Sequence, residues 1–250
     1  MLHVIGSNST IGGALLAHGV AESGTDRAAL DLADPGAVAA YRFPGGVTHA
    51  VFAAAVTSMA ACRDRFEQAL QVNTHAPAEL ARTAEAQGVR CLLLSTNQVF
   101  DGTVPHVQPD GPTCPRSAYG RTKADAEAAV LERGGSVLRL TKVFPDSVLD
   151  EPRLAGWLKT LGNGGRVSAF DDLRLAPVAI HRVVDAVLAW LGGATPRVFQ
   201  RSGPEDITWF DLAQQMAAAA NAPADHVRRS SAASAGVPAG ERPRHTTLSE

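Results

Sequence analysis

The chain has 250 residues, of which 45% are hydrophobic and 19% charged, and its formal net charge is −2 at pH 7. This length and composition suit one sizeable folded domain with a small appended lobe. The nearly balanced charge excludes the basic surplus through which proteins bind nucleic acids or anionic membranes, so we expect neither as a partner. A small molecule is the expected partner.

Cysteine usage and the N-terminal segment indicate the compartment. Cys62, Cys91 and Cys114 are an odd, scattered set without metal-ligand spacing, which suits a reducing cytoplasm. The first residues lack the basic and long apolar segments of a secretion signal, and no stretch approaches the roughly 18 apolar residues of a membrane span. We therefore expect a cytoplasmic protein. The histidines form no metal-ligand pattern either, so we expect that the protein needs no metal.

The N-terminal segment predicts a phosphate-binding turn. Residues 2–5 are typical of a short buried strand, and a glycine-rich turn leads from it into a helix over residues 13–18. Such a turn points helix N-terminal amides at an anion, and glycine lets the backbone approach a pyrophosphate closely. A plain strand-to-helix turn is the alternative. The expected cofactor contacts are Gly6, Asn8, Ser9, Thr10, Ile11 and Gly12.

A second strand is only weakly predicted, between residues 19 and 27. Asp26 lies roughly 20 residues past the first glycine, where an acidic residue would bind the ribose hydroxyls of NADH. Arg27 beside it could instead bind the 2′-phosphate of NADPH. The sequence therefore leaves NADH and NADPH open, and a solvated turn at these two residues is the alternative.

Strand and helix patterns alternate along the next hundred residues. An apolar strand over residues 47–56 ends in Ala53, Ala54 and Ala55, whose small side chains would leave room for a ligand at the strand's carboxyl end. A helix follows over residues 60–87 and a strand over residues 88–94. A loop over residues 100–117 leads to a helix that Ser117 can cap, and a buried strand follows over residues 136–140. This alternation predicts an α/β fold with a parallel sheet.

Three side chains in this region could move a proton. Tyr119 and Lys123 are four residues apart and so lie on one face of the helix. A nearby ammonium favours the phenolate and lowers the pKa of tyrosine from about 10, so Tyr119 could act as general acid or base. Thr96, at the end of the preceding strand, could hold the reacting oxygen by hydrogen bond. A surface helix with a solvated Lys123 is the alternative.

Residues 95–102, Ser-Thr-Asn-Gln-Val-Phe-Asp-Gly, followed by Tyr119-x-x-x-Lys123, resemble the extended short-chain dehydrogenase/reductase superfamily. The nearest likeness is to the dTDP-4-dehydrorhamnose reductase branch, whose members carry Ser-Thr-Asp-Tyr-Val-Phe-Asp-Gly. The likeness implies a Rossmann-like doubly wound parallel sheet. Residues 1–150 would form the NAD(P)-binding domain, and residues 151–250 a small substrate lobe interleaved with the last elements of the sheet.

The resemblance also implies further cofactor contacts. Asp31 and Leu32 would end a strand beside the adenine, and Val143 would lie in the loop beside the nicotinamide. Asn73 matches a Val-Asn element whose asparagine supports the catalytic lysine through a water. Tyr119 and Lys123 would themselves contact the cofactor, Lys123 at the nicotinamide ribose. The superfamily usually writes its phosphate loop Gly-x-x-Gly-x-x-Gly, and Ser9, which replaces the middle glycine, fits only if its φ is negative or its hydroxyl meets the phosphate.

On the substrate side, Asn97 and Gln98 replace the Asp and Tyr of the branch, so hydrogen bonding is kept while charge and ring stacking are lost. Arg174 would contact an anionic substrate such as a nucleotide diphosphate, with a surface ion pair as the alternative. The implied reaction is reduction of a ketone or aldehyde by NADPH or NADH, with Tyr119 protonating the oxygen. The candidate substrates are a nucleotide-linked keto sugar and another small carbonyl compound. A homodimer is the candidate assembly.

Two rivals remain. One is a sugar-nucleotide epimerase that oxidises its substrate transiently. The other is a catalytically idle NAD(P)-binding regulatory subunit. The presence of Thr96, Tyr119 and Lys123 argues against the second rival, whereas Ser9, the weak second strand and the lack of an expected final helix argue for it.

Overall fold

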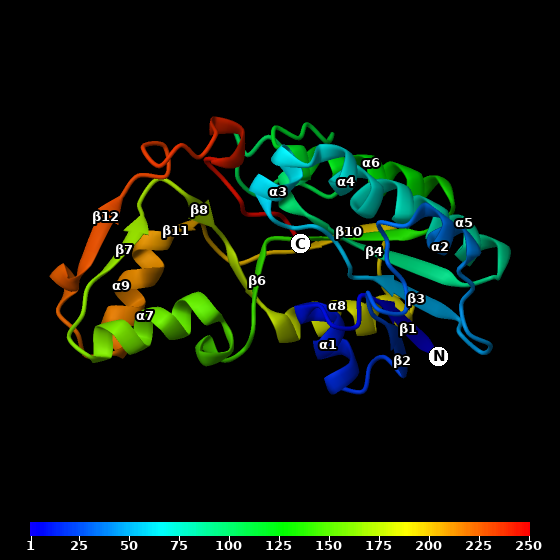
Figure 1. The fold of residues 1–250 in the computed structure, drawn as a ribbon, viewed down its shortest axis with the longest axis horizontal. Helices are drawn as coiled ribbons and strands as arrows, with labels where there is room; N and C mark the ends of the chain where they lie inside the picture. Colours follow the sequence, from blue (N-terminus) through cyan, green and yellow to red (C-terminus); the bar gives the residue numbers. More distant parts are fainter.

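The computed structural model describes the backbone of residues 1–250 and every side chain except that of Val148. Six strands, all paired in parallel, form one sheet in the order β10-β5-β4-β3-β1-β2 (Figure 1). The strands are β1 (Leu2–Ile5), β2 (Ser23–Thr25), β3 (His49–Phe52), β4 (Arg90–Thr96), β5 (Ser136–Leu140) and β10 (Val198–Arg201). The predicted doubly wound α/β fold is confirmed.

Helices cover both faces of this sheet (Figure 1). One face packs against α1 (Thr10–Ala17) and α8 (Ile180–Leu191), and the other against α2 (Pro35–Ala40), α5 (Ala76–Ala86) and α6 (Ala118–Glu132). Strands buried on both faces have near-continuous apolar runs, and β4 accordingly alternates Leu92 and Leu94 toward one core with Leu93 toward the other. Among the helices that the structure describes, none is long and apolar enough to cross a membrane.

A smaller lobe begins where the chain leaves the carboxyl end of β5 (Figure 1, left). It contains α7 (Pro152–Gly162) and α9 (Trp209–Ala219), packed on the parallel pair β7 (Val167–Phe170) and β12 (Val227–Ser230). Shorter pairs join β6 (Lys142–Phe144) to β9 (Pro177–Ala179) and β8 (Arg174–Leu175) to β11 (Ile207–Thr208). The short helical turns of the chain are η2 (Asn97–Val99), η3 (Val148–Asp150), η4 (Ala224–His226) and η5 (Ala239–Glu241).

The helix predicted over residues 60–87 is broken into α3 (Met59–Asp64), α4 (Phe66–Leu70), a π-helical turn η1 (Gln71–His75) and α5. Arg65 leaves helical geometry, with φ −132° and ψ 57°. Pro77 has no N–H to donate to the carbonyl four residues earlier, and in the π turn Ala76 N bonds Gln71 O, five residues back. The apolar periodicity of residues 60–87 shows neither of these two interruptions.

The strand end predicted around Asp31 and Leu32 is wrong, because the residues between β2 and α2 form turns. The Asp26 carboxylate accepts hydrogen bonds from the amides of Ala28 and Ala29, which holds the chain in a turn there. The neighbouring β2 has only three residues and lies at the edge of the sheet, which explains its weak apolar pattern.

A buried ion pair ties the middle of the sheet to α6. Arg139 of β5 contacts both carboxylate oxygens of Glu127, at 2.8 and 3.1 Å, and Ser95 of β4 donates a short hydrogen bond to the same carboxylate. The Glu127 and Arg139 side chains are 3% and 5% exposed. Arg139 also donates to Pro109 O at 2.9 Å. One network therefore connects β4, β5, α6 and the loop after β4.

Replacing Arg139 with methionine is expected to lower the free energy of unfolding by about 3–5 kcal/mol, because Glu127 would stay buried without its counterion. Urea denaturation measures this loss. The matched control is Arg133→Met, which removes an exposed pair with Glu85 at 3.4 Å and should cost about 1 kcal/mol or less. Equal losses in the two variants would contradict a structural role for the buried pair.

Candidate active site

The turn from β1 into α1 brings backbones together at two glycines. Gly6 has φ +93°, and a Cβ built on it would lie 2.6 Å from Ala54 N. A Cβ on Gly12 would lie 2.2 Å from Gly6 O. Neither contact tolerates a side chain, so both glycines are needed for the close packing of this turn on α1 and on the end of β3.

Ser9, which stands where the superfamily has a glycine, is the N-cap of α1. Its φ of −75° is unstrained for serine, and its Oγ accepts a hydrogen bond from Gly12 N at 3.0 Å. The condition under which serine fits this position, a negative φ, is thus met. The helix predicted to begin at Gly13 begins at Thr10, directly after this cap.

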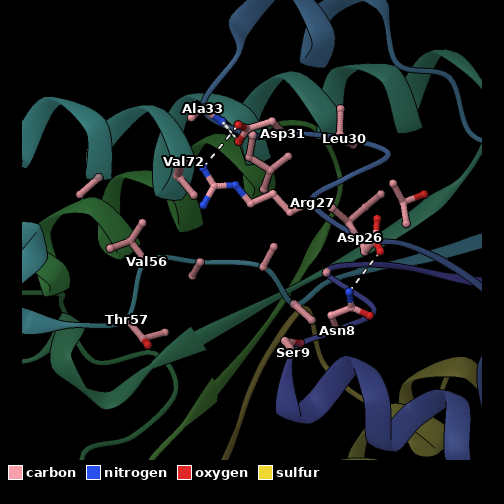
Figure 2. A pocket seen from close by; sticks show the side chains of 18 of the residues that line it. Asn8, Ser9, Asp26, Arg27, Leu30, Asp31, Ala33, Val56, Thr57 and Val72 are labelled. Atoms are coloured by element: carbon pink, nitrogen blue, oxygen red, sulfur yellow. Dashed lines mark hydrogen bonds and ion pairs between the residues drawn. The ribbon is translucent and has the colours of Figure 1, made fainter.

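A cavity of about 630 Å³ opens at the carboxyl ends of β1, β2 and β3 (Figure 2). Twelve of the predicted cofactor residues line it, namely Gly6, Asn8, Ser9, Thr10, Ile11, Asp26, Arg27, Asp31, Leu32, Ala53, Ala54 and Ala55. The other predicted cofactor residues are outside its lining, namely Gly12, Asn73, Tyr119, Lys123 and Val143. The position matches the edge where open parallel sheets bind ligands.

Two charged side chains mark one end of this cavity. The Asp26 carboxylate is committed to local bonds, since it accepts from Asn8 Nδ2 at 3.1 Å besides the two turn amides. Arg27 is 80% exposed and makes one long contact, 3.4 Å from Nη2 to Asp31 Oδ2. Figure 2 shows Asn8 directed toward Asp26 and Arg27 extended toward Asp31. Arg27 is therefore the freer of the two adjacent charges.

The cavity also includes Thr57, Arg65 and Gln68, which sequence reasoning missed. Thr57 precedes α3, Arg65 lies at the break between α3 and α4, and Gln68 is on α4. Arg65 and Gln68 fall within the helix predicted over residues 60–87, and a continuous helix would give them a different orientation. A signal for them would have had to come from the break at Arg65, which the apolar pattern does not show.

Thr96 and Tyr119 meet at the end of β4. Thr96 is the last residue of that strand, Tyr119 lies in the first turn of α6, and the Thr96 hydroxyl is near enough to lower the pKa of Tyr119. The contact depends on Gly120, where a Cβ would lie 2.1 Å from Gln98 O. Ser117 caps α6 as predicted, with Oγ accepting from Gly120 N at 3.0 Å. Tyr119 packs on a cluster that contains Ala69, which also lines the cavity.

Burial controls the protonation of this site. It raises the pKa of Tyr119; the nearby Cys62 raises it further, and the neighbouring Thr96 hydroxyl opposes both effects. Burial also lowers the pKa of Lys123, which is 2% exposed, to about 8, with the charge of Glu127 opposing. The expected lowering of the Tyr119 pKa is therefore absent, because a buried phenolate loses its hydration. At pH 7 Tyr119 carries its proton and Lys123 is mostly charged.

Asn73 lies in the π turn η1 and is fully buried. Its side chain accepts from Val56 N at 2.8 Å, and its Nδ2 donates to Val56 O at 3.0 Å and to Thr122 Oγ1 at 3.1 Å. It thus joins a residue of the cavity wall to the residue next to Lys123. Val143 is the middle residue of β6 and packs on the core beneath the sheet.

The predicted substrate residues lie in two places. Asn97 and Gln98 form the helical turn η2 directly after Thr96, and Asn97 Oδ1 lies 3.4 Å from Thr96 Oγ1. Arg174 is on β8 and lines a second cavity, of about 570 Å³, together with Arg116 and Arg242. The structure thus brings Asn97 and Gln98 to the Thr96–Tyr119 pair, whereas Arg174 belongs to a separate hollow.

Comparison with known proteins finds a family and several relatives. Residues 1–250 match the family described as RmlD substrate binding domain. The probable dTDP-4,6-dihydroxy-2-methyloxan-3-one 4-ketoreductase of Streptomyces antibioticus is 31% identical over 227 residues, which cover 88% of this chain and 75% of that protein. Methionine adenosyltransferase 2 subunit beta of Pongo abelii is 29% identical over 171 residues, which cover 65% of this chain and 51% of that protein. The matched region thus spans about half the length of that relative.

Among solved structures, dTDP-4-dehydrorhamnose reductase from Bacillus anthracis in complex with NADP has a TM-score of 0.85 with this chain. The alignment covers 100% of this chain and 90% of that one, at 18% sequence identity. At this identity the similarity establishes the shared fold.

Replacing Ser9 with alanine is expected to lower the free energy of unfolding by about 1 kcal/mol, because Gly12 N loses its capping oxygen, whereas Ser9→Gly should cost only about a few tenths. Chemical denaturation compares the two variants. Ser7→Ala, two residues earlier, removes a hydroxyl that does not cap α1 and serves as the control. If Ser9→Ala is as stable as Ser7→Ala, the cap does not contribute to stability.

Proposed function

The chain belongs to the RmlD substrate binding domain family, within the extended short-chain dehydrogenase/reductase superfamily, and from this we propose that it is an NAD(P)H-dependent reductase of a nucleotide-linked keto sugar. The observation that carries the proposal is that Thr96 at the end of β4 lies beside Tyr119 in the first turn of α6, with the buried Lys123 one helical turn further along that helix. The name of the Streptomyces antibioticus relative, a dTDP-linked 4-ketoreductase, supports the substrate class.

The cofactor supplies the hydride, and the protein positions the groups that receive it. Thr96 donates a hydrogen bond to the substrate carbonyl oxygen and orients it. Tyr119, protonated at neutral pH, gives its proton to that oxygen as negative charge develops there. The buried Lys123 ammonium stabilises the phenolate that remains and binds the nicotinamide ribose. The raised pKa of Tyr119 suits this direction of reaction, because the resting residue is the acid.

The cavity suits a dinucleotide. Its phosphate end has the two closely packed glycines and the N-terminus of α1, where backbone amides favour an anion. Its adenosine end has Asp26, already bound to three local donors, and the exposed Arg27. We propose NADPH as the preferred cofactor, because Arg27 is free to turn toward a 2′-phosphate.

We also propose that residues 1–150 are the cofactor-binding domain and that residues 151–250 hold the substrate, apart from the elements that complete the sheet. The separate apolar cluster formed by α7, α9, β7 and β12 supports this division. The similarity to subunits of methionine adenosyltransferase supports a second candidate, a cofactor-binding subunit of another protein. Turnover distinguishes the two candidates, because a subunit without catalysis would not need Tyr119.

Replacing Tyr119 with phenylalanine is expected to reduce turnover of a dTDP-linked 4-keto sugar by roughly 100-fold or more, because the proton donor is lost. Binding of NADPH, followed by nicotinamide fluorescence, should stay within about twofold of wild type, since the ring remains. Tyr41→Phe is the control: this other tyrosine bonds His3 Nε2 at 3.0 Å and is not part of the cavity lining. Full turnover by Tyr119→Phe would remove Tyr119 from the mechanism.

Replacing Arg27 with glutamine is expected to weaken NADPH binding by about 10-fold or more and leave NADH binding nearly unchanged, because a charge-assisted hydrogen bond to the 2′-phosphate is lost. Parallel fluorescence titrations with the two cofactors measure the difference. Arg42→Gln removes an arginine that bonds carbonyl oxygens of its own segment and is outside the cavity lining. An equal loss for both cofactors would contradict recognition of the 2′-phosphate by Arg27.

A further inference from the structure

A histidine is buried near the edge of the main sheet. His3 lies on β1 and is 2% exposed, and its ring packs edge-on against Phe43, with the ring centroids 6.2 Å apart. Both ring nitrogens are hydrogen-bonded, Nδ1 to Ser23 Oγ at 2.8 Å and Nε2 to Thr25 Oγ1 at 2.8 Å. A buried polar group without partners would cost free energy, so these two bonds fix the side chain in this place.

Both hydroxyl partners of His3 belong to β2, the edge strand of the sheet. This strand has three residues and pairs with β1 alone. Ser23 and Thr25 are its first and last residues, and their side chains lie on one face because side chains alternate along a strand. So short a strand makes few backbone hydrogen bonds. Its position on β1 therefore depends on the side-chain bonds to His3 as well as on backbone pairing.

Thr25 connects this histidine to the proposed cofactor cavity. It lines the cavity, and its carbonyl accepts hydrogen bonds from Gly6 N at 2.8 Å and from Ser7 N at 3.2 Å. Asp26 and Arg27 follow Thr25 directly and line the same cavity (Figure 2). A shift of Thr25 would therefore move the turn at the phosphate end of the cavity and the two charged residues at its adenosine end.

An imidazole ring can bond both hydroxyls of β2 at once. Burial lowers the pKa of His3, so the ring is neutral at pH 7, with one nitrogen as donor and the other as acceptor. A hydroxyl can take either role, so both bonds form in either tautomer. Tyr41 approaches from the segment after α2, with its hydroxyl 3.0 Å from His3 Nε2 and 3.2 Å from Thr25 Oγ1. Removing the Tyr41 hydroxyl would leave His3 bonded to both residues of β2.

We infer that His3 is a positioning residue for the cofactor, because its bonds to Ser23 and Thr25 hold the edge strand where the dinucleotide needs it. This inference rests on the proposed cofactor site and adds a residue that is not part of the cavity lining. A strand that is already fixed in the free protein does not have to be ordered when the cofactor binds, so His3 raises the affinity for NADPH without touching it.

Fluorescence titration with NADPH compares three replacements of His3. His3→Leu removes both bonds and is expected to raise the Kd for NADPH by about 5-fold or more, because β2 must then be ordered on binding. Glutamine extends its amide to the region of Nε2 and can still bond Thr25, so His3→Gln should restore most of the affinity. Asparagine extends its amide only to the region of Nδ1, so His3→Asn keeps the bond to Ser23 and should bind NADPH as weakly as His3→Leu.

Two further measurements separate a positioning role from a purely structural one. In a double-mutant cycle, the losses of NADPH affinity in His3→Leu and Thr25→Val should not add, because both variants remove the same bond. In steady-state kinetics with a dTDP-linked keto sugar, His3→Leu should raise KM for NADPH and leave kcat within about twofold of wild type. The control Tyr41→Phe keeps both bonds from His3 to β2 and should leave the Kd for NADPH unchanged.

The outcomes separate this inference from the proposed function. Wild-type affinity for NADPH in folded His3→Leu overturns the inference and leaves the reductase proposal standing, and so do additive losses in the cycle. If the variants follow the expected order but wild type reduces no keto sugar, the inference is supported and the reductase proposal fails. If wild type binds neither NADPH nor NADH, both are overturned. Denaturation curves establish that each variant is folded; if His3→Leu is not, the comparison of His3→Gln with His3→Asn decides, and equal affinity of these two overturns the inference.

Discussion

The buried ion pair between Glu127 and Arg139 is the interaction on which the candidate active site depends. Glu127 lies one helical turn beyond Lys123 on α6, and Ser95, which bonds the same carboxylate, directly precedes Thr96 on β4. The pair thus joins the helix that carries the phenol and the ammonium to the strand that carries the hydroxyl. An ion pair that excludes water is costly to form unless all its donors and acceptors are satisfied, and here the serine hydroxyl and a backbone carbonyl satisfy the rest.

Close backbone contact at glycine is the second constraint. Gly6 and Gly12 pack the first turn against α1 and β3, Gly120 lets α6 approach η2, and Gly102 joins the loop after β4 to the late segment that carries Arg244. At each position a methyl group would collide with a neighbouring atom. Gly6 lines the proposed cofactor cavity and Gly102 lines the second cavity, so at both places the spacing of the neighbouring segments depends on the absence of a side chain.

The proposed cofactor cavity and the arginine-lined second cavity are built from different parts of the chain. One is built at the carboxyl ends of β1 to β3, and the other from the loop after β4 together with β8 of the lobe. The small lobe contributes a charged side chain to the second cavity, since Arg174 of β8 lines it.

Much of the fold and of the candidate site was predictable from residues that are neighbours in the sequence. A short apolar strand before a glycine-rich turn, alternating strands and helices, Ser117 before α6 and the Tyr119-x-x-x-Lys123 spacing each depend on neighbours in sequence, and each appears where it was expected. The two wrong predictions each trace to particular residues. Arg65 and Pro77 interrupt a helix that the apolar spacing predicts as continuous. Asp26 holds the chain in a turn ahead of the predicted strand end.

By itself the sequence determined the class of fold and singled out candidate side chains for proton transfer, because periodicity and spacing along one helix are properties of neighbouring residues. Only the tertiary structure decided the protonation of Tyr119, whose pKa burial raises although a lysine is four residues away. It also decided that Arg65 joins one cavity and that Arg116, Arg174 and Arg244 gather at another. Burial and convergence depend on which distant segments pack together, and no short window of sequence contains that information.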